Sequence, residues 1–183
     1  MKIAIIGLPR SGTTSLYFFI KDLLPKYYLC DNEPWSKTKD VEITENCFYK
    51  TLISDNLHLN KNESLTEYGI RMINTFNKII FLRRKDANEM KKSLADMLVR
   101  RYKEYEYCKN LAEKYLDEWI PIFNTLTENK KIYYYEDLYT NNISKDLLDI
   151  CKYLEIDLDE KIYNKWIHIK NKQIEEKVNR TLL

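Results

Sequence analysis

Residues 2–14, Lys-Ile-Ala-Ile-Ile-Gly-Leu-Pro-Arg-Ser-Gly-Thr-Thr, decide the fold of this 183-residue chain. The stretch opens with a short β-branched apolar run that stops at Gly7, which is the pattern of a buried strand. After a loop that reaches Gly12, apolar residues recur at helical spacing until Pro25 ends the pattern. These apolar residues are Leu16, Phe19, Ile20, Leu23 and Leu24. A strand, a glycine-bounded loop and a helix in this order open an α/β domain.

The rest of the chain continues the alternation of strands and helices. Further strands are predicted at residues 27–30, 47–53, 78–83 and 131–135. Amphipathic helices are predicted around residues 90–101, 111–123 and 144–154 and over at least the first half of residues 161–183, with Pro121 as a possible kink and Ser144 or Asn142 as the start of the third. Strands that alternate with helices favour a parallel sheet covered on both faces. We therefore expect a three-layer α/β fold with a mostly parallel sheet, in one compact domain over residues 1–183.

Composition excludes several classes of protein. Lys and Arg number 30 and Asp and Glu number 28, so a net charge of +2 provides no general field for nucleic acid. No apolar run approaches the ~20 residues of a membrane span, and the first residues lack the features of a signal peptide. The four Cys are far apart, which favours free thiols over disulfides or a zinc site. A cytoplasmic protein without a membrane span is expected.

The loop between Gly7 and Thr14 has the chemistry of an anion site. Backbone N–H groups in such a loop and the positive end of the following helix form a cradle for phosphate or sulfate. The spacing matches the P-loop pattern Gly-x4-Gly-Lys-Ser/Thr, but Thr13 stands at the lysine position. That lysine normally reaches the β- and γ-phosphates, so its absence counts against hydrolysis of ATP or GTP. Arg10 supplies the cation instead, with a guanidinium suited to a bidentate clamp.

Pro9 to Thr14, Pro-Arg-Ser-Gly-Thr-Thr, resembles the 5′-phosphosulfate-binding loop of sulfotransferases that use 3′-phosphoadenosine 5′-phosphosulfate (PAPS). Arg10 makes the loop similar to that of tyrosylprotein and many bacterial sulfotransferases, since cytosolic members usually have Lys there. The resemblance implies a P-loop nucleotide-hydrolase-like sulfotransferase fold, PAPS as cofactor, 3′,5′-ADP as product and no metal. It also implies that the cofactor is bound by Pro9, Arg10, Ser11, Gly12, Thr13 and Thr14.

A later segment resembles the 3′-phosphate site of the same family, in which a strand ends in Arg and a following helix supplies Ser. Here the strand at residues 78–83 runs into Arg83 and Arg84, and Ser93 lies in the next helix. The resemblance implies Arg84 and Ser93 as ligands of the 3′-phosphate, with Arg83 as the alternative to Arg84. Independently, two Arg at the carboxyl end of a strand stand where α/β sheets bind ligands.

Sulfuryl transfer also needs a general base and a group that stabilises charge on the leaving phosphate. In tyrosylprotein and several carbohydrate sulfotransferases the base is a Glu about 20 residues after the phosphosulfate loop, a place that Glu33 occupies here. Asp31 and His58 are alternatives, and an acidic turn before Pro34 without a catalytic role is a further interpretation. Lys50 is similar to a Lys that lies beside the transferring group in glycan sulfotransferases, and is the candidate to share that charge with Arg10.

Two more segments are similar to the family. Tyr135–Leu138, Tyr-Glu-Asp-Leu, resembles a late segment with a supporting role, and Cys151–Ile156 resembles a helix and turn in which the family has Gly and this chain does not. The resulting hypothesis is transfer of a sulfuryl group to the hydroxyl of a small molecule, glycan or tyrosine. A P-loop kinase or nucleotide hydrolase with an atypical loop, and a non-catalytic nucleotide-binding protein, are the alternatives.

Overall fold

A computed structural model describes residues 1–7, 12–32, 43–52, 67, 70–71, 74–102, 104–124, 128–139 and 142–181. Within these residues, strands pair in one sheet of order β2-β3-β1-β4-β5, and every pair is parallel. The strands are β1 (Lys2–Gly7), β2 (Leu29–Asn32), β3 (Cys47–Leu52), β4 (Lys78–Arg83) and β5 (Lys130–Tyr134). The parallel sheet expected from the sequence is confirmed.

Helices follow or separate the strands as the apolar periodicity predicts. They are α1 (Thr13–Leu23), α4 (Ala87–Tyr102), α5 (Tyr105–Asn124), α6 (Tyr135–Leu138), α7 (Lys145–Leu154) and α8 (Glu160–Thr181). The side chain of Ser144 accepts a hydrogen bond from the N–H of Leu147, so Ser144 caps α7. Helix α5 continues past Pro121 to Asn124 without interruption.

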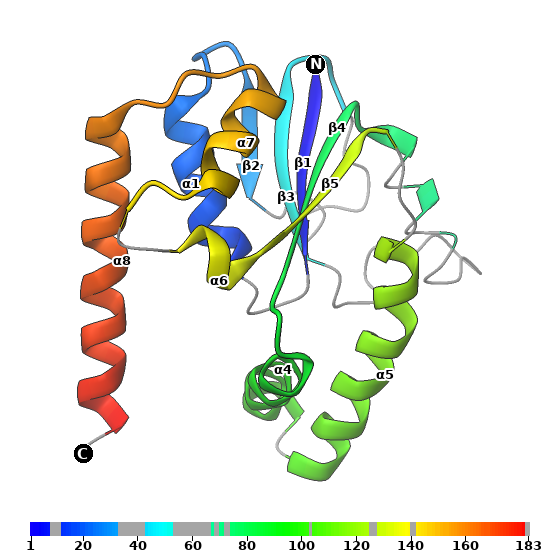
Figure 1. The fold of residues 1–183 in the computed structure, drawn as a ribbon. Coiled ribbons are helices and arrows are strands. Elements are labelled where there is room, and N and C mark those ends of the chain that lie inside the picture. Colours follow the sequence, from blue (N-terminus) through cyan, green and yellow to red (C-terminus); the bar gives the residue numbers. More distant parts are fainter. Residues whose placement is uncertain are drawn as a thin grey trace.

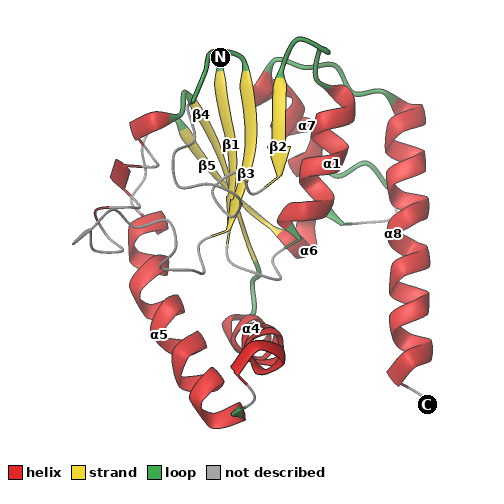
Figure 2. Ribbon diagram, turned by 180° about the vertical axis from the view of Figure 1, so that it is seen from behind, coloured by secondary structure: helices red, strands yellow, loops and turns green. Residues whose placement is uncertain are grey.

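Helices cover both faces of the sheet, which makes three layers (Figures 1 and 2). On one face, Ala4, Ile6, Ile79 and Phe81 pack against residues of α4 and α5. On the other face, Ile3, Ile5, Phe48 and Ile80 pack against α1, α7 and α8. Since successive strand residues point to opposite faces, both sets of side chains are buried, and β1 and β4 read as continuous apolar runs.

Helix α1 is fixed to the sheet and to α8 by aromatic rings. The ring of Tyr17 stacks on that of Phe48 in β3, with centroids 5.1 Å apart, and Phe19 stacks on Trp166 of α8 at 4.6 Å. All four side chains are buried. Aromatic pairs of this kind add to the hydrophobic gain from burial, so the start of α1 is held in a defined place above the sheet.

The carboxyl ends of the parallel strands meet at one edge of the sheet. Gly7 pairs with Leu52 on one side and Leu82 on the other, while Arg83 pairs with Tyr134. The chain leaves β1 through α1 toward β2 and returns to the other side of β1 with β4, so the strand order reverses next to β1. Ligands of open α/β sheets bind at this kind of edge.

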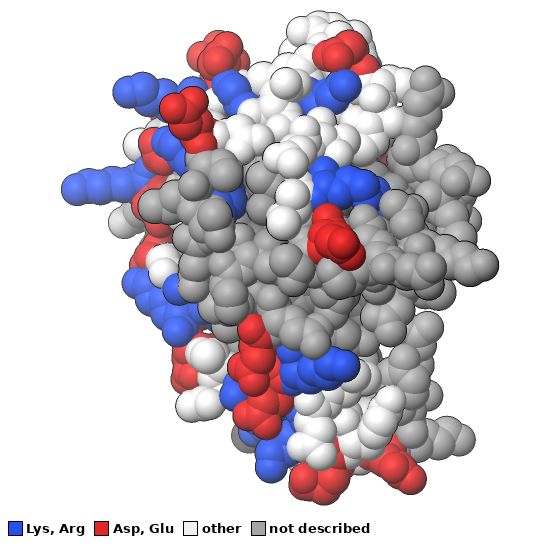
Figure 3. All heavy atoms as spheres, turned by 90° about the vertical axis from the view of Figure 1, so that its right-hand side faces the viewer, with Lys and Arg blue, Asp and Glu red and all other residues white. Residues whose placement is uncertain are grey.

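Charges of both signs share the described surface. On the face drawn in Figure 3, basic and acidic side chains stand next to one another. Within the described residues, no helix has the length and apolar character needed to cross a bilayer. The four cysteines are free thiols, and three of them are buried, as the spacing predicts.

Candidate functional site at the carboxyl edge of the sheet

The predicted site residues divide between described and undescribed parts of the chain. Pro9, Arg10, Ser11, Glu33 and His58 lie outside the described residues. The structure places the others at or near the carboxyl edge of the sheet. These are Gly12, Thr13, Thr14, Asp31, Lys50, Arg83, Arg84 and Ser93.

Gly12 begins α1 in a conformation that favours glycine. Its φ of 85° lies in the left-handed region, and a Cβ at this position would lie 2.8 Å from Cε2 of Tyr135 and 3.1 Å from Cε2 of Tyr139. The glycine is thus required both by its backbone conformation and by the close packing of two tyrosine rings. Thr13 is buried and Thr14 is exposed, so only the second of these threonines presents its side chain to solvent.

Three hydrogen bonds from Tyr139, which follows α6, and from Trp166 in α8 reach the start of α1. The hydroxyl of Tyr139 donates to the carbonyl of Gly12 over 2.8 Å. The indole Nε1 of Trp166 donates to the carbonyl and the hydroxyl of Ser15 over 3.1 and 2.9 Å. Burial is the main cause that raises the pKa of Tyr139, so this phenol stays protonated and able to donate.

Lys50 lies in β3 with its side chain fully buried. It pairs with Ile5 of β1 and with Asn32, the last residue of β2, and it points to the face of the sheet that α1 covers, like Phe48 two residues earlier. Asp31 pairs instead with Tyr49, on the face covered by α4 and α5. The alternative base Asp31 and the candidate Lys50 therefore project to opposite faces of the sheet.

Arg84 lies between the start of α1 and the start of α4. Its guanidinium carbon is 5.0 Å from the centre of the Tyr135 ring, whose edge is the one that packs against Gly12. An Nη atom of Arg84 also lies 3.2 Å from a carboxylate oxygen of Glu89 in the first turn of α4. Glu89 is largely exposed, so this is a solvent-screened ion pair of small net strength.

Arg83 occupies a different environment from Arg84. It ends β4 and points to the face that carries Ile79 and Phe81. Its guanidinium donates to the hydroxyl of Tyr134 over 2.9 Å and lies 4.9 Å from the centre of that ring. The ring of Tyr135 therefore contacts both Arg84 and the start of α1, whereas Arg83 contacts a different ring, that of Tyr134.

Ser93 is half-buried in α4, four residues after Glu89. Residues four apart lie on the same face of a helix, so Ser93 stands one turn beyond the carboxylate that contacts Arg84. Asp86 caps this helix by accepting hydrogen bonds from the N–H groups of Asn88 and Glu89. The turn that carries Arg84 thus leads directly into the face of α4 that carries Ser93.

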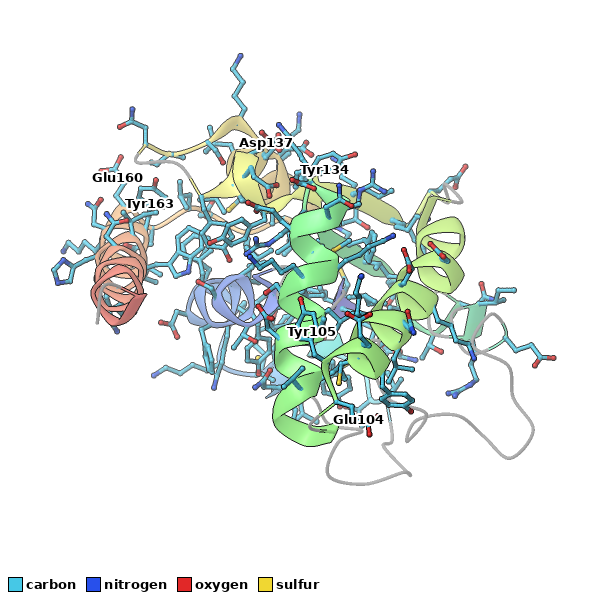
Figure 4. All side chains as sticks on the ribbon, turned by 90° about the horizontal axis from the view of Figure 1, so that it is seen from below. Glu104, Tyr105, Tyr134, Asp137, Glu160 and Tyr163 are labelled. Carbon is cyan, nitrogen blue, oxygen red and sulfur yellow. The ribbon has the colours of Figure 1, made fainter. Side chains whose placement is uncertain are left out.

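The carboxylates of α6 hold that turn. Glu136 accepts a hydrogen bond from the backbone N–H of Lys85 over 3.0 Å, and Asp137 forms an ion pair with its ammonium group. In Figure 4, which looks onto this edge of the sheet, Tyr134 and Asp137 lie beside the start of α4, and Glu104 and Tyr105 lie at its far end. Glu136 and Asp137 therefore both contact Lys85, the residue after Arg84.

Three residues at this edge are absent from the sequence prediction: Tyr139, Trp166 and Glu89. No sequence motif predicts Tyr139 or Trp166, because their hydrogen bonds to the start of α1 join residues that are 127 and 151 positions apart in the sequence. The only signal for Glu89 is its place in the first turn of α4 after a capping Asp. Among the described residues, no group of three or more His, Cys, Asp or Glu is arranged to hold a metal ion.

Comparison with known proteins finds a similarity in structure and no match in sequence. No protein-family model and no curated protein sequence matches the chain. The crystal structure of mouse sulfotransferase SULT7A1 complexed with PAP is similar, with a TM-score of 0.53 and 17% sequence identity. The match covers 91% of this chain and 62% of the mouse protein. At this identity the likeness speaks for the fold, and the chain has the fold of the PAPS-dependent sulfotransferases that its first loop resembles.

Proposed function

We propose that the protein is a sulfotransferase that moves a sulfuryl group from PAPS to an acceptor hydroxyl. The observation that carries the proposal is the position of Tyr135, whose ring contacts Gly12 at the start of α1 and Arg84 at the end of β4. The side chain of Tyr135 therefore contacts both the N-terminus of α1 and the guanidinium group of Arg84. A nucleotide with phosphates at two separate positions, 3′ and 5′, matches these two anion-binding groups.

Two groups of residues bind the two ends of the nucleotide. The start of α1, with Gly12, Thr13 and Thr14, binds the 5′-phosphosulfate together with Pro9, Arg10 and Ser11. Arg84 and Ser93 bind the 3′-phosphate, and Arg84 is favoured over Arg83 because Arg83 is directed to the other face of the sheet and to Tyr134. The similar mouse protein was crystallised with PAP, which is 3′,5′-ADP, and this supports the same choice of ligand.

PAPS supplies an activated sulfuryl group, and residues of the chain move the proton and stabilise the charge. Glu33 accepts the proton of the acceptor hydroxyl while the acceptor oxygen forms a bond to sulfur. The bond between sulfur and the 5′-phosphate oxygen breaks, and both electrons stay on the phosphate. Arg10 and Lys50 stabilise that negative charge. Lys50 suits this role because it is buried on the α1 face of the sheet, where a charge acts through little water.

The test is transfer of labelled sulfate from PAPS to a panel of phenols, sugars and tyrosine peptides. Glu33→Gln should slow transfer by about 10²-fold or more and leave 3′,5′-ADP affinity nearly unchanged, because only the base is lost. Glu45→Gln is the matched control, since Glu45 pairs with Met1 and Lys2 at the opposite edge of the sheet. Arg10→Ala should abolish binding or transfer.

Other results would select the alternatives. Phosphoryl transfer from ATP with Mg²⁺ would favour a kinase. Binding of 3′,5′-ADP without transfer to any acceptor, and without an effect of Glu33→Gln, would favour a non-catalytic nucleotide-binding protein.

A further inference from the structure

We propose that Tyr139 and Trp166 are positioning residues that hold the first turn of α1 in the orientation that receives the 5′-phosphate of the nucleotide. The inference rests on the proposed function and adds Tyr139, which follows α6, and Trp166 of α8 to the nucleotide site. Neither residue is expected to touch the nucleotide. Each acts through a backbone carbonyl of α1.

The contacts form one continuous network. The Tyr139 hydroxyl donates to the carbonyl of Gly12, and its ring centre lies 5.1 Å from that of Trp166. Trp166 in turn donates to both oxygens of Ser15. The ring of Trp166 is itself stacked on Phe19, so the donor groups are anchored in the core. The two ends of the first turn of α1 are therefore fixed by the side chains of Tyr139, after α6, and Trp166, in α8.

These hydrogen bonds act on the groups that face an anion. The first N–H groups of a helix have no partner within the helix, and their dipoles make its N-terminus positive. The carbonyl of Gly12 belongs to the same peptide unit as the N–H of Thr13. This carbonyl accepts from Tyr139 and also from the N–H of Leu16 at 3.2 Å. Hydrogen bonds in series polarise one another, so the bond from Tyr139 strengthens the N–H of Thr13 as a donor.

The positions of the rings add a steric constraint. Tyr135 and Tyr139 lie 4.3 Å apart between ring centres; the ring of Tyr135 excludes a Cβ at Gly12, and the ring of Tyr139 would lie within 3.1 Å of one. Gly12 therefore has little freedom to rotate its carbonyl away from Tyr139. When the donor groups of a site are already in position, ligand binding has a smaller entropic cost and is therefore tighter.

Tyr139→Phe tests the inference because it removes the hydroxyl and keeps the ring. Calorimetric titration with 3′,5′-ADP should show affinity weaker by about three- to tenfold, the range of one lost hydrogen bond. Titration with 3′-AMP, which lacks the 5′-phosphate, should change by less than about twofold. Trp166→Phe, which removes the indole donor, should act in the same direction. The inference requires that the affinity for 3′,5′-ADP, which carries a 5′-phosphate, falls much more than the affinity for 3′-AMP.

Tyr153→Phe is the matched control. The hydroxyl of Tyr153 also donates to a backbone carbonyl, that of Asn129, and accepts from the N–H of Ile79 at 3.1 Å. It lies at the amino end of β4 and β5, away from Gly12. This variant should lose thermal stability and keep the 3′,5′-ADP affinity of the wild type.

Three results would overturn the inference: unchanged 3′,5′-ADP affinity in Tyr139→Phe, equal weakening of both ligands in that variant, or the same weakening in Tyr153→Phe. Failure of the proposed function gives a different result, because the wild-type protein itself would then not bind 3′,5′-ADP or would prefer ATP with Mg²⁺.

Discussion

The guanidinium of Arg84 lies over the ring of Tyr135, with 5.0 Å between its central carbon and the ring centre. The arrangement orients the arginine beside the start of α1, since the edge of the same ring packs on Gly12. Planar guanidinium groups stack on aromatic rings and still present their N–H groups at the edge. Arg84 is therefore held beside the start of α1 by a stacking contact, and one of its Nη atoms pairs with Glu89.

Replacing Arg84 by Ala should weaken binding of 3′,5′-ADP by about 10- to 100-fold, the effect of losing hydrogen bonds to a charged group. Affinity for 5′-AMP, which has no 3′-phosphate, should change little. The matched variant is Arg83→Ala, which removes the arginine that binds Tyr134. Calorimetry with both nucleotides distinguishes the two arginines, and a larger selective loss in Arg83→Ala would reverse their assignment.

Glu89→Gln should tighten binding of 3′,5′-ADP by about two- to fivefold at low salt, because the carboxylate that competes with the phosphate for Arg84 is removed. The gain should shrink at 0.5 M salt, which screens exposed charges over about 4 Å. Glu113→Gln, which breaks the Lys91 pair between α4 and α5, is the control and should leave affinity unchanged. Equal or weaker binding in Glu89→Gln would show that Glu89 does not oppose the ligand.

Asp149 links α7 to β5 and should make stability depend on acid pH. Hydrogen bonds from Lys131 and Tyr133 lower the pKa of Asp149 in the folded state below its ordinary value of 3.8. The stabilisation is therefore present above the unfolded-state pKa and is lost as the pH falls through the lower, folded-state pKa.

Asp149→Asn should lower the free energy of unfolding by about 1 kcal/mol at pH 7, a small value because the carboxylate is partly exposed. The difference from wild type should shrink as the pH falls below 3.8 and disappear below the lower, folded-state pKa, where both side chains are neutral. Urea unfolding across this pH range measures the effect, with the exposed Asp157→Asn as control. A difference that persists unchanged to low pH would contradict the ionic origin.

Glu155 adopts a left-handed conformation, with φ of 58°, at the end of α7. Glycine favours this conformation, so Glu155→Gly should raise the thermal midpoint by about 2 °C through relief of backbone strain. Glu155→Ala keeps the strain and loses the ion pair with Lys78, and should lower the midpoint. Since both variants lack the ion pair, a midpoint no higher in Glu155→Gly than in Glu155→Ala would show that the left-handed backbone conformation is not strained at this turn.

Local patterns account for the part of the fold that the sequence predicts. The strand at residues 78–83 has the predicted bounds because a β-branched apolar run ends in charged residues at both sides. The sequence alone does not show to which face of the sheet Arg83 and Arg84 point. Their surroundings differ because β4 pairs with β5, which places Tyr134 beside Arg83. Glu155 shows a further limit, since α7 ends in a turn typical of Gly without containing one.

The long-range contacts of the site follow from packing and not from spacing. Gly12 is predictable as part of a phosphate loop, but its contacts with Tyr135 and Tyr139 depend on where β5 and α6 lie in the sheet. The bond from Trp166 to Ser15 likewise requires α8 to pack on α1. Sequence motifs therefore predict which groups bind a ligand, and the structure shows which residues pack against some of those groups.

The most direct test of a sulfotransferase cofactor site is calorimetric titration of the protein with 3′,5′-ADP, 5′-ADP, and ATP with Mg²⁺. A protein that recognises both phosphates at the carboxyl edge of the sheet should bind 3′,5′-ADP with micromolar affinity, without metal, and much more tightly than 5′-ADP. Equal affinity for 3′,5′-ADP and 5′-ADP, or a preference for ATP with Mg²⁺, would contradict the account.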